Sequence, residues 1–196
     1  MRLTPPMTMM NFFRKSQGTW YTQRSVHHFD CSDDESGESN LIVRVVDADD
    51  PSVSKICHQQ DVNPAVAVGG ASFSWRANLM DWSDDESNAA ILVDIPNESD
   101  PQRGKLIRDR GYVESIPVVS HYWFAEDGVV TIDTDYDCNR GQERCWFITD
   151  DFRVRVSTVR TAGGVNLMTY CSEFRCTSED ELMQAIERNR QRAGGK

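Results

Sequence analysis

The sequence has no apolar run long enough to cross a membrane, and it has too little positive charge to bind polyanions. Its longest apolar runs fall far short of the roughly 20 residues that a transmembrane helix needs, and residues 1–10 contain no apolar stretch typical of a secretory signal. It has 21 Lys and Arg against 31 Asp and Glu, a formal net charge of −10. Because binding to nucleic acid or to an anionic membrane depends on positive charge, we expect neither as a partner.

Motifs for common cofactors are also missing. There is no Gly-rich phosphate loop, dinucleotide-binding fingerprint, nucleophile elbow or His-Glu-x-x-His motif. The four histidines have no spacing typical of metal ligands. The six cysteines form no Cys-x-x-Cys pair, and we interpret them as reduced thiols, several of them in the core. We therefore predict neither a metal nor a nucleotide cofactor.

The sequence does contain a strong pattern of β-strands. Its 196 residues, 39% apolar content and five Trp suit one domain with a real core. Period-two runs rich in Val, Ile, Thr and aromatic residues, separated by short acidic turns, predict ten strands. They cover residues 20–29, 40–46, 54–59, 71–80, 89–95, 116–124, 129–136, 143–148, 153–159 and 166–175. Ten short strands without alternating helices indicate an all-β fold, an antiparallel β-barrel whose closure removes the exposed edges.

One helix is predicted on each side of the strands. Thr8 can cap a short helix over residues 9–16, and Ser178 with Glu181 forms a capping box that starts a second helix. We divide the chain into a flexible N-terminal segment, a single barrel domain, and a C-terminal helix with its tail, at residues 1–10, 11–177 and 178–196. The turn-rich residues 96–111 are predicted as a solvated loop or as a flap over one barrel mouth.

Charged side chains occur inside several of the predicted strands. In residues 20–29 the alternation puts Arg24 on one face and His27 on the other. In residues 153–159 it puts Arg153 and Arg155 on one face with Ser157. A small barrel can hold one ligand, Arg suits a ligand carboxylate, and Trp offers flat walls, although for any single Trp ordinary core packing is the simpler interpretation. The residues alone indicate a barrel that can bind an anionic, planar ligand.

Several motifs in the same order resemble a known family, the S-type phycobiliprotein chromophore lyases (the CpcS/CpeS family). The resemblance extends over residues 11–175, nearly the whole chain. The segments that carry it are Asn11-Phe12-Phe13 with Ser16-x-Gly18-x-Trp20, Gln23-Arg24 with His27-His28, Gly104 to Tyr112, Ile116-Pro117-Val118-Val119, Glu143-Arg144-x-Trp146-Phe147, Arg153-x-Arg155-x-Ser157-Thr158-Val159, and Cys171-Ser172-Glu173-Phe174-Arg175.

The resemblance implies a lipocalin-like barrel, similar to the fatty-acid-binding proteins, that binds a linear tetrapyrrole (a bilin) non-covalently. It implies transfer of this bilin to a cysteine of an apo-phycobiliprotein as a thioether, so that the bilin is a substrate and no cofactor is needed. Motif details closer to the phycoerythrin-type branch favour phycoerythrobilin and a phycoerythrin-type subunit, with phycocyanobilin left open. Family precedent allows homodimers or heterodimers and implies residence in cyanobacterial cytoplasm or plastid stroma.

The same resemblance assigns roles to individual residues. Two acids are expected to engage and protonate the pyrrole nitrogens, and one histidine has a proton-transfer or structural role: Glu143, Glu173 and His27. Arg153 is expected to hold a propionate. The full set of substrate contacts is Arg24, Trp75, Trp146, Arg153 and Arg155, in which the two Trp side chains pack against the rings.

Two alternatives remain at the level of sequence. The first is a carrier or chaperone with the same barrel that binds a bilin or another apolar acid without attaching it. The second is an acidic interaction module whose charged turns bind a partner without any small ligand. The pair Glu143 and Glu173 favours a lyase over a carrier, because a passive carrier needs the arginines but not the acids.

Overall fold

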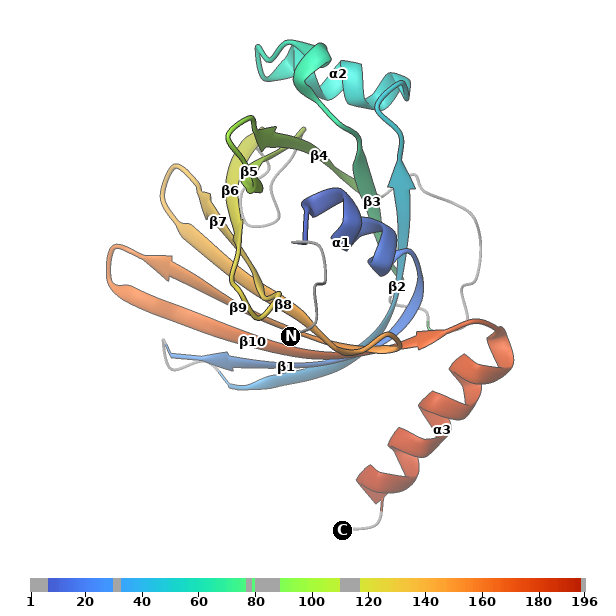
Figure 1. Ribbon diagram of the computed structural model, residues 1–196. Coiled ribbons are helices and arrows are strands. Elements are labelled where there is room, and N and C mark those ends of the chain that lie inside the picture. Colours follow the sequence, from blue (N-terminus) through green and yellow to red (C-terminus); the bar gives the residue numbers. More distant parts are fainter. Residues whose placement is uncertain (1–6, 30–32, 77–78, 80–88, 110–116, 195–196) are drawn as a thin grey trace.

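A computed structural model describes residues 7–29, 33–76, 79, 89–109 and 117–194 of the chain. Ten antiparallel strands form a closed barrel in which each strand pairs with its neighbours in sequence, and the last strand pairs with the first (Figure 1). The strands are β1 Gly18–His28, β2 Glu35–Val46, β3 Gly70–Arg76, β4 Ala90–Asn97, β5 Asp100–Arg108, β6 Val118–Phe124, β7 Val130–Asp135, β8 Arg140–Thr149, β9 Phe152–Thr161 and β10 Gly164–Cys176. The predicted all-β barrel of ten strands is confirmed.

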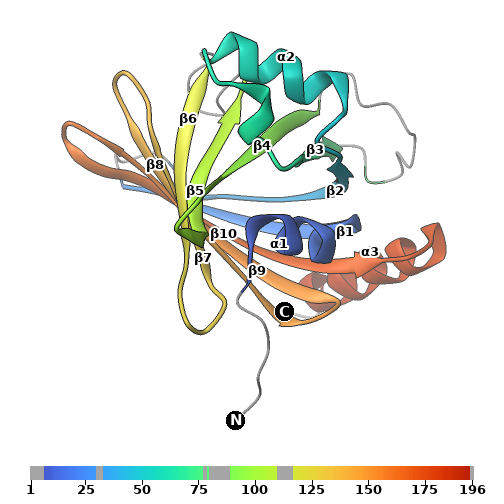
Figure 2. The same ribbon diagram turned by 45° about the horizontal axis from the view of Figure 1, so that its top comes forward.

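Helix α1 (Met9–Ser16) packs against the inside of the barrel (Figures 1 and 2). Thr8 caps it, since its side chain accepts a hydrogen bond from the Asn11 amide. The apolar side of α1 joins the main core together with inward-facing Trp20 and residues of β2 and β6. Met9 and Met10 are buried in this core, so they belong to the helix and not to the flexible segment predicted for residues 1–10. Residues 1–6 lie outside the described part of the chain.

The predicted strand at 54–59 is wrong, because these residues belong to helix α2 (Pro51–Gln59). Asp50 caps the helix by accepting from the Ser52 amide, and proline stands in the first turn, where its missing N–H costs nothing. The buried residues Val53, Ile56 and Cys57 have helical spacing. They pack on the outer face of β4 and β5 beside a short 3₁₀ turn, η1 (Pro64–Val66).

The loop or flap predicted at 96–111 is also wrong for residues 100–108, which form β5 between β4 and β6. Leu106 faces the barrel core and Ile107 faces α2, so the last part of the strand is buried on both sides, and no polar–apolar alternation of the sequence marks it. Gly104 fits this strand because a Cβ there would lie 2.5 Å from the Ile95 carbonyl oxygen and 2.7 Å from the Tyr122 hydroxyl. These two errors cancel in the strand count, and residues 110–116 lie outside the described set.

Helix α3 (Glu179–Gly194) packs on the outer face of β1 and β10. Its apolar contacts are Tyr21 and Cys176 of the barrel against Leu182, Ala185 and Ile186 of the helix. The Ser178 hydroxyl accepts from the Glu181 amide at 3.2 Å, as the capping box predicts, and the Glu181 carboxylate accepts from the Thr177 amide at 2.7 Å. No helix in the described residues is long and apolar enough to span a membrane.

The Arg175 side chain on β10 connects the last strand of the barrel to the residues that precede the first strand. Its guanidinium donates to the carbonyl oxygens of Lys15 in the last turn of α1 and of Gln17, the C-cap of that helix, and to that of Asp150 in the turn between β8 and β9. It also lies over the Trp20 ring at 4.3 Å from the centroid. The end of the barrel beneath α1 is thus closed by residues from the beginning and the end of the chain.

Candidate functional site

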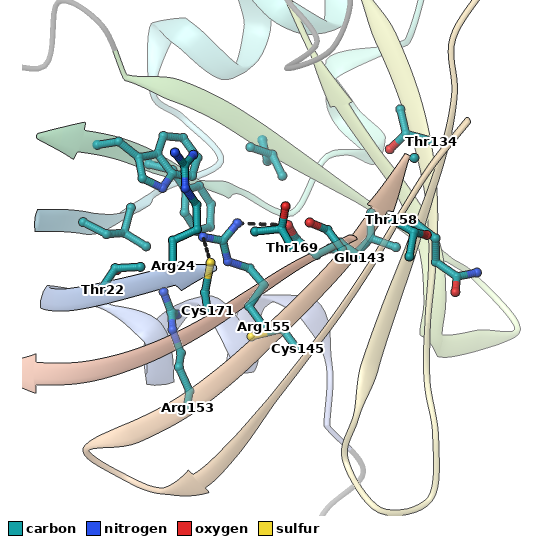
Figure 3. Close-up of a pocket in the computed structure, with 18 of the residues that line it drawn as sticks. Thr22, Arg24, Thr134, Glu143, Cys145, Arg153, Arg155, Thr158, Thr169 and Cys171 are labelled. Carbon is teal, nitrogen blue, oxygen red and sulfur yellow. Dashed lines mark hydrogen bonds and ion pairs between the residues drawn. The ribbon is translucent and has the colours of Figure 1, made fainter. Parts of the chain in front are cut away.

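A cavity of about 360 Å³ lies inside the barrel. One wall, formed by α1, β2, β3 and β4, is mainly apolar, with large contributions from Phe12, Phe13, Phe73 and Trp75. The opposite wall, formed by β1, β8, β9 and β10, is polar (Figure 3). Every second side chain of each strand points inward, so the residue types at these positions decide the character of each wall. The cavity can therefore hold a ligand with one flat apolar face and several polar groups.

The polar wall contains a chain of buried ion pairs. Arg153 Nε lies 2.5 Å from Glu173 Oε2, and Arg155 Nη2 lies 3.1 Å from Glu173 Oε1. Arg155 Nη1 extends the chain to Glu143 Oε2 at 3.2 Å. The register of the sheet produces these contacts, since Glu173 on β10 is directly opposite Arg153 on β9. The predicted sharing of one face by Arg153 and Arg155 is confirmed, and the two acids belong to the same cluster.

The two acids of this cluster differ in their surroundings. Glu173 is completely buried and does not line the cavity, whereas both arginines that pair with it do. Its burial alone would raise its pKa, but the charges of Arg153 and Arg155 outweigh burial and hold that pKa below the ordinary value. Glu143 lines the cavity, and its side chain is 32% exposed. Glu173 is therefore a fixed carboxylate, whereas Glu143 can reach a ligand.

The four arginines of the cavity also differ. Arg153 is buried between its ion pair with Glu173 and the Trp20 ring, whose centroid lies 4.4 Å from the guanidinium carbon. Arg24 is exposed and enters from β1, one strand beyond β10. Arg108 enters from β5, is buried, and donates to the Tyr136 hydroxyl at 3.1 Å. The four arginines and Glu143 that line the cavity, together with Glu173, carry a formal net charge of two positive.

Besides Glu173, two further residues assigned from the family resemblance do not line the cavity. His27 is on the outer face of β1, as the alternation predicts, and its Nδ1 lies 2.7 Å from Asp34 Oδ2. Trp146 alternates with the inward-facing Cys145 and lines a separate depression on the barrel surface, beside Lys15 and Arg144. Trp75 does line the cavity, stacked on Phe73 with 6.1 Å between ring centroids.

Sequence reasoning missed several residues of the cavity. Arg108 fell in the segment predicted as a loop, although the apolar pair before it is a signal of a strand end. Cys145 and Cys171 also line the cavity. Each stands two residues from one of the assigned acids in a predicted strand, so the alternation already placed them on the same face.

A second buried carboxylate lies apart from the cavity. Asp94 on β4 is 2% exposed and accepts a hydrogen bond from the Tyr122 hydroxyl on β6 at 2.9 Å. Burial raises the pKa of Asp94 to about 7, against a smaller lowering by the Tyr122 bond. Among the residues that the structure describes, no group of His, Cys, Asp and Glu side chains is arranged to hold a metal ion.

Comparisons with known proteins agree with this architecture. The family model described as CpeS-like protein matches residues 8–176. A chromophore lyase CpcS/CpeS 4 from Trichodesmium erythraeum is 58% identical over 193 residues, covering 98% of this chain and all of that protein. A chromophore lyase CpcS/CpeS from Synechococcus is 46% identical over 180 residues, covering 92% of this chain and 90% of that protein.

A solved structure shows the same fold. The S-type phycobiliprotein lyase CPES from Guillardia theta superposes with a TM-score of 0.66 and 29% identity, covering 88% of this chain and 95% of that one. Family model, relatives and fold therefore agree over nearly the full length, and the chain belongs to the CpcS/CpeS family of chromophore lyases.

Proposed function

We propose that this chromophore lyase binds a linear tetrapyrrole in the barrel cavity, with phycoerythrobilin as the preferred pigment. It transfers the pigment to a cysteine of an apo-phycobiliprotein, preferably a phycoerythrin-type subunit. The single observation that carries the proposal is the cavity wall on which Arg155 joins Glu143 and Glu173, opposite an aromatic wall. The cyanobacterial relatives and the Guillardia theta structure support residence in cyanobacterial cytoplasm or plastid stroma.

The charge of the cavity suits such a ligand. A bilin carries two propionates, and the cavity wall offers a net charge of two positive. Arg24 and Arg155 are the arginines that we assign to the propionates, because Arg24 is exposed and the Arg155 side chain is 19% exposed, whereas that of Arg153 is 3% exposed beside the Trp20 ring. The assignment of Arg153 changes accordingly: it positions Glu173 and Trp20. Trp75 and Phe73 supply a flat surface for the pyrrole rings.

The chemistry requires a proton donor near the pyrrole nitrogens. When the acceptor thiolate attacks the ethylidene carbon of ring A, a sulfur–carbon bond forms and an electron pair moves into the conjugated system. Protonation or polarisation of the pyrrole nitrogens stabilises that charge. We assign this role to Glu143, which lines the cavity, and a supporting role to Glu173, which two arginines hold ionised. His27 and Trp146 receive no role at the pigment, because both lie on the outer face.

Two steps of one experiment test the proposal. Purified protein mixed with phycoerythrobilin is expected to shift the visible absorption of the pigment, and Trp75→Ala is expected to weaken this binding. The matched variant Trp146→Ala should leave binding intact. No shift with the wild-type protein would contradict any bilin-binding function and favour an acidic interaction module.

The second step adds an apo-phycobiliprotein subunit. A lyase leaves a covalently attached pigment that persists in acid-denatured spectra and in zinc-stained gels of the acceptor. Binding without attachment would instead identify a carrier with the same barrel. A parallel reaction with phycocyanobilin determines the pigment preference.

A further inference from the structure

One thiol of the cavity lies between two arginines. Cys171 on β10 is 1% exposed, lines the cavity, and is directly opposite Arg155 on β9 and Arg24 on β1. Arg155 Nη2 lies 3.6 Å from the Cys171 sulfur, and Figure 3 shows the Arg155 side chain between Glu143 and Cys171. Cationic neighbours stabilise a thiolate, so this is an environment in which a cysteine can become a nucleophile.

The carboxylates of Glu143 and Glu173 oppose the stabilisation of a Cys171 thiolate by the arginines. Burial is the main cause that raises the pKa of Cys171, Arg155 lowers it, and Glu173 and Glu143 raise it again. Arg155 is the shared group, because it binds both acids as well as the sulfur. Burial and the two acids together therefore favour the protonated thiol, and the acids are the part of this effect that depends on their ion pairs with Arg155.

The other cavity thiol provides an internal comparison. Cys145 on β8 is opposite Arg155 on its other side, so both cysteines occupy the same row of the sheet. Burial raises the pKa of Cys145 to about 12, and the hydrogen bond of Arg155 goes to Cys171. Cys145 is therefore the less reactive of the two and a matched control.

An independent feature places a ligand at this wall. The Thr22 hydroxyl, on β1 two residues before Arg24, is 2% exposed, lines the same cavity, and has no hydrogen-bond partner within the described residues. A buried polar group without a partner is costly unless a ligand or water satisfies it. Thr22 is opposite Glu173, and Cys171 is opposite Arg24, so Thr22 and Cys171 are diagonal neighbours on the cavity face of the β1–β10 pair.

We propose that Cys171 is an internal acceptor thiol that Glu143 and Glu173 hold inactive through Arg155. The proposal rests on the proposed function, because the electrophile is the ethylidene group of the tetrapyrrole. In the reaction the Cys171 sulfur bonds to the ethylidene carbon, the carbon–carbon π pair moves into the conjugated system, and the thiol proton ends on the tetrapyrrole. Nothing leaves and no electrons are exchanged, so the product is a thioether with the summed mass of protein and pigment.

The variant Glu143→Gln tests this directly. It removes one charge that restrains Arg155 at a partly exposed position, so folding is preserved more readily than with a change at buried Glu173. Wild-type and variant proteins are incubated with phycoerythrobilin without an acceptor, denatured, and examined by zinc-enhanced fluorescence and intact mass. Because Glu143 is also the proposed proton donor for the addition, the adduct is compared with the transfer that the same protein gives to an acceptor subunit: we expect the ratio of Cys171 adduct to transfer to be about tenfold higher in Glu143→Gln than in the wild type.

Double variants locate the site. Adding Cys171→Ser to Glu143→Gln should abolish the covalent pigment, whereas adding Cys145→Ser should leave it. If Glu143→Gln binds pigment but forms no adduct, or if the adduct survives Cys171→Ser, the proposal is overturned.

A second probe separates this inference from the proposed function. N-ethylmaleimide reacts with thiolates without any pigment, and peptide mass spectrometry gives its rate at Cys171. We expect that rate to rise about tenfold in Glu143→Gln and to stay low at Cys145. If no protein shifts the pigment spectrum, the proposed function fails, and the maleimide rate then decides the state of the thiol: a rise supports restraint by Glu143, and an unchanged rate overturns it.

Discussion

Two buried carboxylates in one barrel have pKa values that are shifted in opposite directions. Glu173 in the cavity wall is flanked by Arg153 and Arg155, and their charges lower its pKa despite burial. Asp94, between β4 and β6, has the Tyr122 hydroxyl as its hydrogen-bond partner, and burial raises its pKa to about 7. Burial is similar at the two sites, so the nearby positive charge decides the outcome. The ionised site adjoins the cavity, and the site with the raised pKa belongs to the packed core.

Removing the positive charge beside Glu173 should have the largest effect. Arg153→Ala leaves a buried carboxylate with one arginine and removes the stacking on Trp20. Breaking a buried ion pair costs about 3–5 kcal/mol, which urea unfolding at pH 7 would measure. The double variant Arg153→Met with Glu173→Gln should recover part of this loss, because it buries no charge. A loss below about 1 kcal/mol for Arg153→Ala would show that Arg155 alone compensates.

The two sites should also respond to pH in opposite directions. Between pH 4 and pH 7 folded Asp94 keeps a proton that the unfolded chain releases, so its contribution to stability falls as pH rises through this window. A shift of this size corresponds to at most about 4 kcal/mol. Asp94→Asn should remove that slope in urea unfolding at pH 4.5, 6 and 7.5, and an unchanged slope would place its cause elsewhere.

The contribution of Glu173 to folding stability changes with pH in the opposite direction to that of Asp94. Because its folded pKa is lowered, its contribution is present above the ordinary value near 4.5 and is lost as the pH falls through the folded pKa. Acid unfolding of Asp94→Asn should therefore still occur below pH 4.

The partly exposed acid of the cluster should affect transfer more than stability. Glu143→Gln removes the proposed proton donor, and general acid catalysis contributes about 100-fold or more. We expect the transfer rate to an acceptor subunit to fall about 100-fold, pigment affinity to change less than threefold, and unfolding free energy to change by less than about 1 kcal/mol. Equal losses of binding and transfer would instead make Glu143 a binding residue.

The smallest effect is expected at the core site. Tyr122→Phe removes the hydrogen bond to Asp94, which costs about 1–2 kcal/mol. The loss should be greater at pH 8 than at pH 5, because an ionised carboxylate depends more on its donor. A thermal denaturation series over this range, with Tyr136→Phe as a second hydroxyl deletion, would check it.

The sequence predicted the barrel well, because alternation identifies strands with one polar and one apolar face, as around Arg153 and Arg155. The prediction was wrong for segments that do not have one polar and one apolar face. β5 is buried on both sides at Leu106 and Ile107, and the short run 54–59 has apolar residues that suit either a strand or a helix.

The partners of the charged residues could not be predicted at all. Arg153 meets Glu173 only because β9 and β10 pair in one particular register, which includes an irregularity between Val165 and Leu167. A shift of one residue would move every side chain to the other face. The sequence therefore identified the ions of the site but not the pairs they form.

The closure of the barrel also has a consequence for folding. Strand β1 needs β10 as its second neighbour, and the hydrogen bonds of Arg175 to the carbonyls of Lys15 and Gln17 span 160 and 158 residues. Contacts so distant in sequence form late and slowly. Strand β10 supplies Cys171 to the cavity and is the last strand of the barrel in the sequence, so the cavity is complete only when β10 has paired with β1.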